Sequence, residues 1–244
     1  MHRGGDCAKW TRRFEEERER RHAQGDPDWA RSATLHPAVW AGIQSFQVGE
    51  NGDGAGLLAK ADEAGDTDYG PAVRLFVTEE RNHAHLLAPL LAAGGRPTLT
   101  THWSDTAFVR LRRLMGLRRE LLVLTVAEVV ALRYYRALRE GTNDPLTSDV
   151  AGRILSDEQR HVPFHCERLH ASLTELPRPI RRPLMALWQL LLPTVSLAVA
   201  ADHGPALRRL DIGRLRFVAD AATSSRAVVS AILSPRPDAW TSAA

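Results

Sequence analysis

The chain has 244 residues, of which 44% are hydrophobic and 25% are charged, a balance typical of a globular protein and not of a disordered or fibrous one. The pI is about 9.2, but the net charge is only +3 and the arginines are spread along the chain, so we expect no nucleic-acid partner. Two cysteines, Cys7 and Cys166, are too few for a disulfide framework or a paired-cysteine metal site. Because residues 1–9 also lack the apolar core of a secretory signal, we expect a cytoplasmic protein.

Residues 1–35 are predicted to form a charged N-terminal arm. The run TRRFEEERERRH at 11–22 carries opposite charges four residues apart, which indicates a solvated helix or a loose arm and not a site. From residue 36 onwards the apolar spacing is helical, and no run alternates as a strand would, so we predict an all-α fold. Glycine and proline punctuation predicts helices at 37–64, 71–93, 105–115, 117–140, 146–173, 180–201 and 204–233.

The segment from 175 to 244 is predicted to be a helical extension packed on the preceding helices. Its run Leu184–Ala201 has no charged residue, and this composition also raises the question of a membrane. Because the run is short for a membrane span and contains Gln189, Thr194 and Ser196, we expect a buried fifth helix and disfavour membrane docking.

Two Glu-x-x-His pairs are predicted to face the core. The pattern occurs four times, beginning at Glu19, Glu80, Glu158 and Glu167. At 100° per residue, Glu80 and His83 share a face with apolar residues, and so do Glu158 and His161. The first and last matches fall on charged, solvated faces. Only the two inward pairs therefore remain as candidate metal ligands.

Two further carboxylates are predicted to join these pairs. Glu128 is the only charged residue of the run Leu121–Leu132, and a lone buried carboxylate costs several kcal/mol unless it is paired or bound to a metal. Glu50 lies on the apolar face of its own helix, and it precedes Glu80 by thirty residues, as Glu128 precedes Glu158. Each half is then a helical hairpin with one Glu on its first helix and Glu-x-x-His on its second, the ligand set of two-metal sites in four-helix bundles.

Some assignments near this set stay open. Three glycines follow Glu50 within six residues, so the helix either continues with close packing or a local bulge, or ends early. Asp53, on the same helix face as Glu50, is the rival ligand. His165 could be an added metal ligand or a substrate contact, but the favoured interpretation is a core histidine. Tyr135 is similarly read as a core aromatic in preference to a redox tyrosine, and Cys166 as an inert apolar side chain.

The segments EERNH at 79–83 and DEQRH at 157–161 are similar to the paired EExxH and DExxH segments of the ferritin-like superfamily of di-iron carboxylate proteins. Oxygen-activating members of that superfamily, including acyl-carrier desaturases, carry such segments. The resemblance implies a ferritin-like four-helix bundle over residues 36–174, with additional C-terminal helices.

The resemblance also implies a role for each candidate ligand. Glu80 and Glu158 would bridge the two metal ions. Glu50 and His83 would complete the ligand shell of one ion, and Glu128 and His161 that of the other. Glu79 and Asp157, which directly precede the bridging glutamates, would each accept a hydrogen bond from a ligand imidazole.

The site predicts a class of chemistry. A carboxylate-rich set with two imidazoles favours two iron ions, with manganese as second choice. The first hypothesis is an oxygen-dependent oxidoreductase of the hydroxylase, desaturase or N-oxygenase type, using molecular oxygen, a small or carrier-bound organic substrate and an external electron donor. The helices after residue 180, which could wall a substrate cavity, favour it. The alternatives are a ferroxidase, iron-storage or rubrerythrin-like protein and a non-catalytic helical scaffold; a homodimer stays open.

Overall fold

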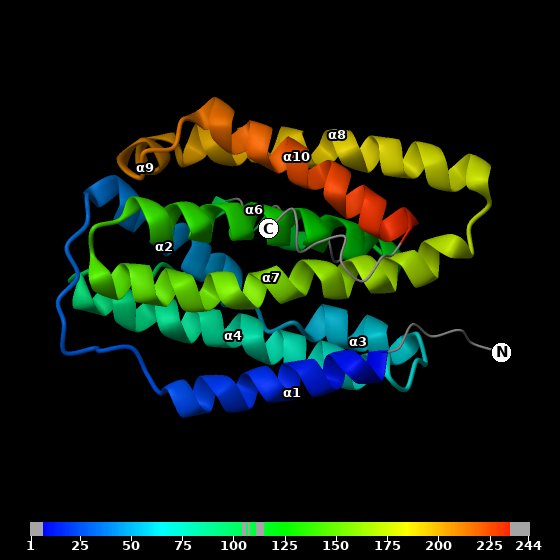
Figure 1. Ribbon diagram of the computed structural model, residues 1–244, viewed down its shortest axis with the longest axis horizontal. Helices are drawn as coiled ribbons and strands as arrows, with labels where there is room; N and C mark the ends of the chain where they lie inside the picture. The colour runs from blue at the N-terminus through cyan, green and yellow to red at the C-terminus, as the bar shows by residue number, and fades with distance from the viewer. Residues whose placement is uncertain (1–6, 104–105, 107, 111–114, 235–244) are drawn as a thin grey trace.

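The chain folds into long, roughly parallel and antiparallel helices (Figure 1). The computed structural model describes residues 7–103, 106, 108–110 and 115–234, and no strand occurs among them. The helices are α1 (Cys7–Gln24), α2 (Pro37–Glu50), α3 (Ala55–Glu63), α4 (Tyr69–Ala93), α6 (Leu117–Gly141), α7 (Pro145–Thr174), α8 (Arg178–Asp202), α9 (Gly204–Arg209) and α10 (Arg214–Leu233). The all-α prediction is confirmed, while the short helix predicted at 105–115 lies largely outside the described residues.

Helices α2, α4, α6 and α7 form a four-helix bundle. The pairs α2 with α4, α4 with α7, and α6 with α7 are in direct contact. On one side α1 packs along α4, and on the other α8 and α10 pack on each other and cover α6 and α7 (Figure 1). The bundle is therefore enclosed between an N-terminal helix and a C-terminal helical layer.

Local sequence explains where the bundle helices begin. His36 precedes Pro37 at the start of α2, and its Nδ1 accepts a hydrogen bond of 3.1 Å from the Ala38 amide. Asp144 likewise precedes Pro145 at the start of α7, and its Oδ1 accepts a hydrogen bond of 2.8 Å from the Thr147 amide. Both helices start close to where the sequence predicts them.

Two predicted helices are each divided in two. In the segment 37–64 the first helix ends at Glu50 and a second begins at Ala55. Of the alternatives left open by the sequence, the early end of the helix is therefore the one observed. Gly54 has φ +64°, and a Cβ there would lie 2.5 Å from Val77 Cγ1, so both the backbone and the packing require glycine. The single helix predicted at 204–233 is wrong, because α9 and α10 are separated around Asp211, whose φ is +57°.

Residues 11–22 are helical and mostly exposed, as one of the two expectations had it, but they do not form a loose arm, because one face of α1 is docked. Trp10 and Phe14 of α1 are buried in the main core. The Phe14 ring meets the Phe164 ring of α7 edge-on, with 5.2 Å between their centroids. Burial of each such side chain stabilises the fold by about 1.5–3 kcal/mol, which is sufficient to dock α1 despite its charges.

Helix α8 is buried on one face only, which corrects the expectation of a buried fifth helix. Its inner face carries Met185, Trp188 and Leu192, and Trp188 Nε1 donates a 2.8 Å hydrogen bond to the Leu122 carbonyl of α6. By length and hydropathy α8 is the one helix among the described residues that could cross a membrane, and 28% of its most apolar window is buried.

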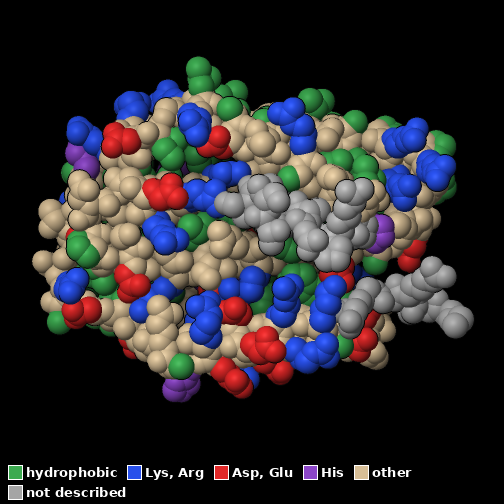
Figure 2. Space-filling view, in the orientation of Figure 1, with side chains coloured by type: hydrophobic (Ala, Val, Ile, Leu, Met, Phe, Trp, Pro, Cys, Tyr) green, Lys and Arg blue, Asp and Glu red, His purple; other side chains and the backbone are tan. Residues whose placement is uncertain are grey.

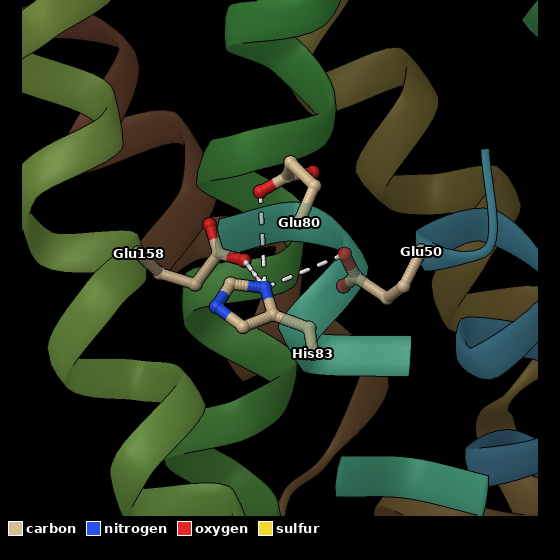
Figure 3. Close-up of side chains that lie close together, drawn as sticks. All are labelled: Glu50, Glu80, His83 and Glu158. Atoms are coloured by element: carbon tan, nitrogen blue, oxygen red, sulfur yellow. Dashed lines mark ion pairs between the residues drawn. The ribbon is translucent and has the colours of Figure 1, made fainter. Parts of the chain in front are cut away.

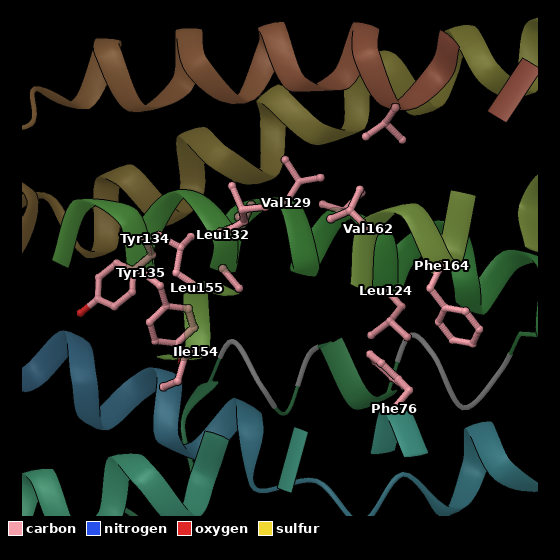
Figure 4. Packing of buried hydrophobic residues seen from close by; sticks show 14 of the residues in the cluster. Phe76, Leu124, Val129, Leu132, Tyr134, Tyr135, Ile154, Leu155, Val162 and Phe164 are labelled. Atoms are coloured by element: carbon pink, nitrogen blue, oxygen red, sulfur yellow. The ribbon is translucent and has the colours of Figure 1, made fainter. Parts of the chain in front are cut away.

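The core continues along the inner faces of α6 and α7 (Figure 4). Tyr134 and Tyr135 lie towards one end of this core, and Phe76 and Phe164 towards the other. Phe76 lies edge-on to the His161 ring, with 4.7 Å between their centroids. The polar residues of the bundle interior are thus held in a rigid apolar surround.

Candidate metal centre

The structure brings all six predicted ligand side chains together inside the bundle. Their donor atoms form two overlapping groups, and within each group the atoms lie within 4.8 Å of one another. The groups are Glu50, Glu80, His83 and Glu158, and Glu80, Glu128, Glu158 and His161. Glu80 and Glu158 belong to both groups, so they occupy the positions that a pair of bridging carboxylates would need. We call these six residues the donor cluster.

His83 is the centre of the first group (Figure 3). Its Nδ1 lies 3.5 Å from Glu50 Oε2, 3.7 Å from Glu80 Oε1 and 3.5 Å from Glu158 Oε1. Three carboxylates from three different helices therefore converge on one ring nitrogen. The side chain of His83 is fully buried, so this convergence takes place away from bulk solvent.

His161 has the equivalent position in the second group. Its Nδ1 lies 3.1 Å from Glu80 Oε1, 3.3 Å from Glu128 Oε2 and 3.6 Å from Glu158 Oε2. The two imidazole rings are 5.6 Å apart between centroids. The cluster thus contains two adjacent sets of converging nitrogen and oxygen atoms, as two neighbouring metal ions require.

Several of these atoms have no hydrogen-bond partner among the described residues. They are Nδ1 of His83, Nδ1 of His161, Oε1 of Glu80 and Oε2 of Glu158, all buried. Buried polar atoms are nearly always satisfied, because an unsatisfied one costs about 1–3 kcal/mol. Metal ions between the two groups would satisfy all four atoms at once, so the donor set fits a two-metal centre.

The outer carboxylates, Glu79 and Asp157, hold the far side of each imidazole. His161 Nε2 lies 3.0 Å from Glu79 Oε2, and His83 Nε2 lies 3.3 Å from Asp157 Oδ2. When Nε2 carries the ring proton and donates to the carboxylate, Nδ1 is left as an acceptor facing the donor cluster. The predicted contacts are confirmed, and they cross the bundle, because each carboxylate comes from the helix opposite its histidine.

Arg21 of α1 is a site residue that the sequence analysis missed. Its Nη1 lies 2.5 Å from Glu79 Oε1 and 3.0 Å from Asp157 Oδ1, so it joins the two outer carboxylates. Arg160 of α7 reinforces them with a close ion pair to Asp157. Phe14 follows Trp10 by four residues and Arg21 follows it by eleven, so all three lie on one helix face. This spacing is the signal in the sequence that could have identified Arg21.

The residues left open by the sequence are now placed. Asp53 is exposed and accepts a 3.0 Å hydrogen bond from the Ala55 amide, so it lies outside the donor cluster and Glu50 lies within it. Tyr135 donates a 2.8 Å hydrogen bond to Glu50 Oε1, so this core aromatic also touches the cluster. His165 is fully buried, with its Nε2 3.7 Å from Glu128 Oε1. Cys166 is buried, and burial raises the pKa of its thiol well above the usual range.

Burial raises the pKa of the two carboxylates that both groups share, Glu80 and Glu158. That of Glu80 rises to about 7, first through loss of solvent and then through the negative charges of Glu128 and Glu50. The pKa of Glu158 is raised well above its usual range by burial and by Glu128. Without a cation these carboxylates therefore tend to hold protons near neutral pH.

The imidazoles also favour protons. Burial by itself would lower the pKa of His83, but the hydrogen bond of its Nε2 to Asp157 and the negative charges of Glu50 and Glu80 outweigh burial and raise the pKa well above its usual value. The pKa of His161 is raised by its carboxylate partners in the same way. Because metal ions bind deprotonated carboxylates and neutral imidazole, protons and metal ions compete for this cluster.

Comparison with known proteins supports the fold. No protein-family model matches the chain, and no curated protein is similar to it in sequence. Among solved structures, an R2-like ligand-binding oxidase mutant with an aerobically reconstituted Mn/Fe cofactor is similar, with a TM-score of 0.69 and 13% sequence identity. The match covers 91% of this chain and 93% of the other. The chain therefore has a ferritin-like bundle fold of the kind found in di-metal carboxylate proteins.

Proposed function

We propose that the donor cluster binds two metal ions, preferably iron and otherwise manganese, and that the protein is an oxygen-dependent oxidase. The observation that carries this proposal is the set of four buried, unpartnered polar atoms that converge between His83 and His161. Four carboxylates neutralise two divalent ions, whereas an empty cluster would leave like charges close together.

The choice of metal follows from the donors. Four carboxylates and two imidazoles form a hard, oxygen-rich set, which suits iron and manganese better than zinc. The structural neighbour carries a Mn/Fe cofactor and is described as an oxidase, which agrees with this choice. The redox activity of these ions, when bound, would supply electrons for the reduction of molecular oxygen.

The protein's own residues would hold the centre in a fixed geometry. The outer carboxylates orient both imidazoles through Nε2, and Arg21 forms ion pairs that hold both carboxylates in place. Tyr135 holds one oxygen of Glu50, leaving the other directed at His83. The aromatic and aliphatic surround excludes water from most of the cluster, so that protons and electrons are exchanged only where the cluster is open.

The cluster is most open at Glu80. Its side chain is 22% exposed, compared with 1% for Glu158 and 3% for Glu128. We infer that oxygen and an organic substrate approach from the Glu80 side. A small or carrier-bound substrate undergoing hydroxylation, desaturation or N-oxygenation fits this proposal, with an external electron donor restoring the centre after each turnover.

Metal analysis followed by oxygen uptake tests the proposal. The purified chain should contain, or take up anaerobically, two iron or manganese ions. One stoichiometric uptake of oxygen by the iron-loaded protein would support an oxidase that awaits its organic substrate. Continued uptake with added ferrous ion would instead support a ferroxidase. Failure to bind two ions per chain would contradict the metal centre and leave a non-catalytic scaffold.

A further inference from the structure

The outward face of α8 is the most apolar exposed surface of the described residues. Nine large hydrophobic side chains are exposed among them, and five belong to this one helix. The five are Ile180, Leu187, Leu190, Leu191 and Leu197. Figure 2 shows hydrophobic side chains at intervals along the edge of the molecule where α8 lies, with basic side chains gathered at the right-hand end of that edge. Contiguous apolar patches of this kind mark interaction sites.

The spacing of this face is regular. Its central positions are Pro183, Leu187, Leu190, Thr194, Leu197 and Ala201, and they follow one another at intervals of four and three residues. We call these six positions the α8 stripe. Such alternation is the pattern of a seam between two packed helices. This spacing keeps all six positions on one side of α8, so they can meet a second helix along their whole length.

We propose that the α8 stripe packs against the α8 stripe of a second copy of this chain, in antiparallel orientation, to form a homodimer. The intervals of the stripe are the same in both directions along the helix. A two-fold axis near residue 192 therefore places Leu187 opposite Leu197 of the partner subunit and Leu190 opposite the partner's Thr194. The stripe is about 27 Å long at 1.5 Å per residue, so five helical turns take part.

The charges at the ends of α8 favour the antiparallel orientation. Arg178, Arg181 and Arg182 lie in the first turns, and no acidic residue lies between them and the far end of the helix. Asp202, whose side chain is 34% exposed, closes the other end, where the helix dipole is also negative. An antiparallel pair brings each arginine cluster near the negative end of the other helix. A parallel pair would bring six arginines together.

The oligomeric state of the full chain tests this proposal, which does not depend on the metal centre. Sedimentation equilibrium should show a dimer, and Leu190→Arg should raise its dissociation constant by about 100-fold or more, because the substitution occurs twice in a two-fold interface. Leu215→Arg is the matched control, since Leu215 on α10 is 82% exposed and lies outside the stripe. Thr194→Leu should strengthen the dimer, because it fills the centre of the seam.

Disulfide cross-linking tests the orientation. Both native cysteines, Cys7 and Cys166, are buried, so a cysteine introduced on α8 is the accessible thiol. An oxidised mixture of Leu187→Cys and Leu197→Cys chains should give the mixed disulfide, while each variant alone should stay uncross-linked.

Three results would overturn the proposal. The first is a chain that stays monomeric at all concentrations, and the second is a monomer that binds phosphatidylglycerol vesicles through α8 and loses this binding in Leu190→Arg. The third is cross-linking of Leu187→Cys with itself, which would show a parallel pair. Circular dichroism of each variant verifies that the helical fold is intact.

Discussion

Replacement of Glu128 by glutamine tests the metal centre at its most isolated ligand. Glu128 is buried on α6, where its neighbours along the helix are apolar, and its Oε2 lies 3.3 Å from His161 Nδ1. Glutamine keeps the shape of the side chain but removes the negative charge that a divalent ion needs. We expect the metal ion on the His161 side to be lost or weakened, while the bundle remains folded.

The size of the effect follows from the geometry. An ion beside His161 would have three carboxylates around it, of which Glu128 is the only one that does not also belong to the His83 group. Loss of a polar group that merely supports a metal ligand typically lowers affinity 10- to 100-fold. We therefore expect at least about 100-fold for a direct ligand, which is roughly 2.7 kcal/mol. In a chain of this length that corresponds to about 5–10 °C of metal-induced stabilisation.

The assay is thermal unfolding of each protein with excess ferrous or manganous ion and with a chelator. The difference between the two midpoints isolates the contribution of the metal from any change in the metal-free fold. Glu19→Gln is the matched control, since Glu19 begins another Glu-x-x-His match but is exposed on α1. If Glu128→Gln kept the parent's metal-induced shift and two ions per chain, the ligand assignment would be refuted. An equal loss in Glu19→Gln would point to a nonspecific effect of charge.

Three further predictions concern the surroundings of the centre. Arg21→Met should lower the metal affinity about 10- to 100-fold, because it releases both outer carboxylates. Arg12→Met, on the exposed side of α1, should leave the affinity unchanged, and metal titration of the two variants measures the difference. Tyr135→Phe should lower the free energy of unfolding by about 1 kcal/mol, measured with urea, because the bond to Glu50 is lost. The chelated protein should lose stability as the pH rises from about 5 to 8. The raised pKa of Glu80, about 7, means that its protonated form stabilises the fold below that pH, and a midpoint that rose with pH would contradict this.

The sequence predicted the inside of the bundle well because helical periodicity reports which residues share a face. Glu80 and His83 were separated from the chance match at Glu19 by the apolar or charged character of their neighbours. Glu128 was visible because a single charge in an apolar run demands compensation. The choice between Glu50 and Asp53 could not be made in this way, since it depends on where α2 ends, and that is decided by the packing of Gly54 against Val77.

The layers around the bundle were predicted less well, because their faces are defined by contacts far apart in the sequence. In α1, charged residues outnumber the apolar side chains, so Trp10 and Phe14 did not stand out as a packing face. In α8 the opposite occurs, since hydropathy predicts burial but does not say whether the chain's own bundle or another molecule covers each side. Leu187 and Leu190 are exposed for that reason, although the helix as a whole is apolar.

The placement of α1 bears directly on the charge of the centre. The donor cluster contributes four carboxylates, and the outer carboxylates add two more negative charges. Two divalent ions and neutral imidazoles would balance only the four inner charges. Arg21 and Arg160 balance the outer two, one from α1 and one from α7. A buried site with an uncompensated charge is costly, so the metal-loaded bundle is electrically complete only with α1 docked. The N-terminal helix would therefore belong to the proposed metal centre through its charge, although it would contribute no ligand.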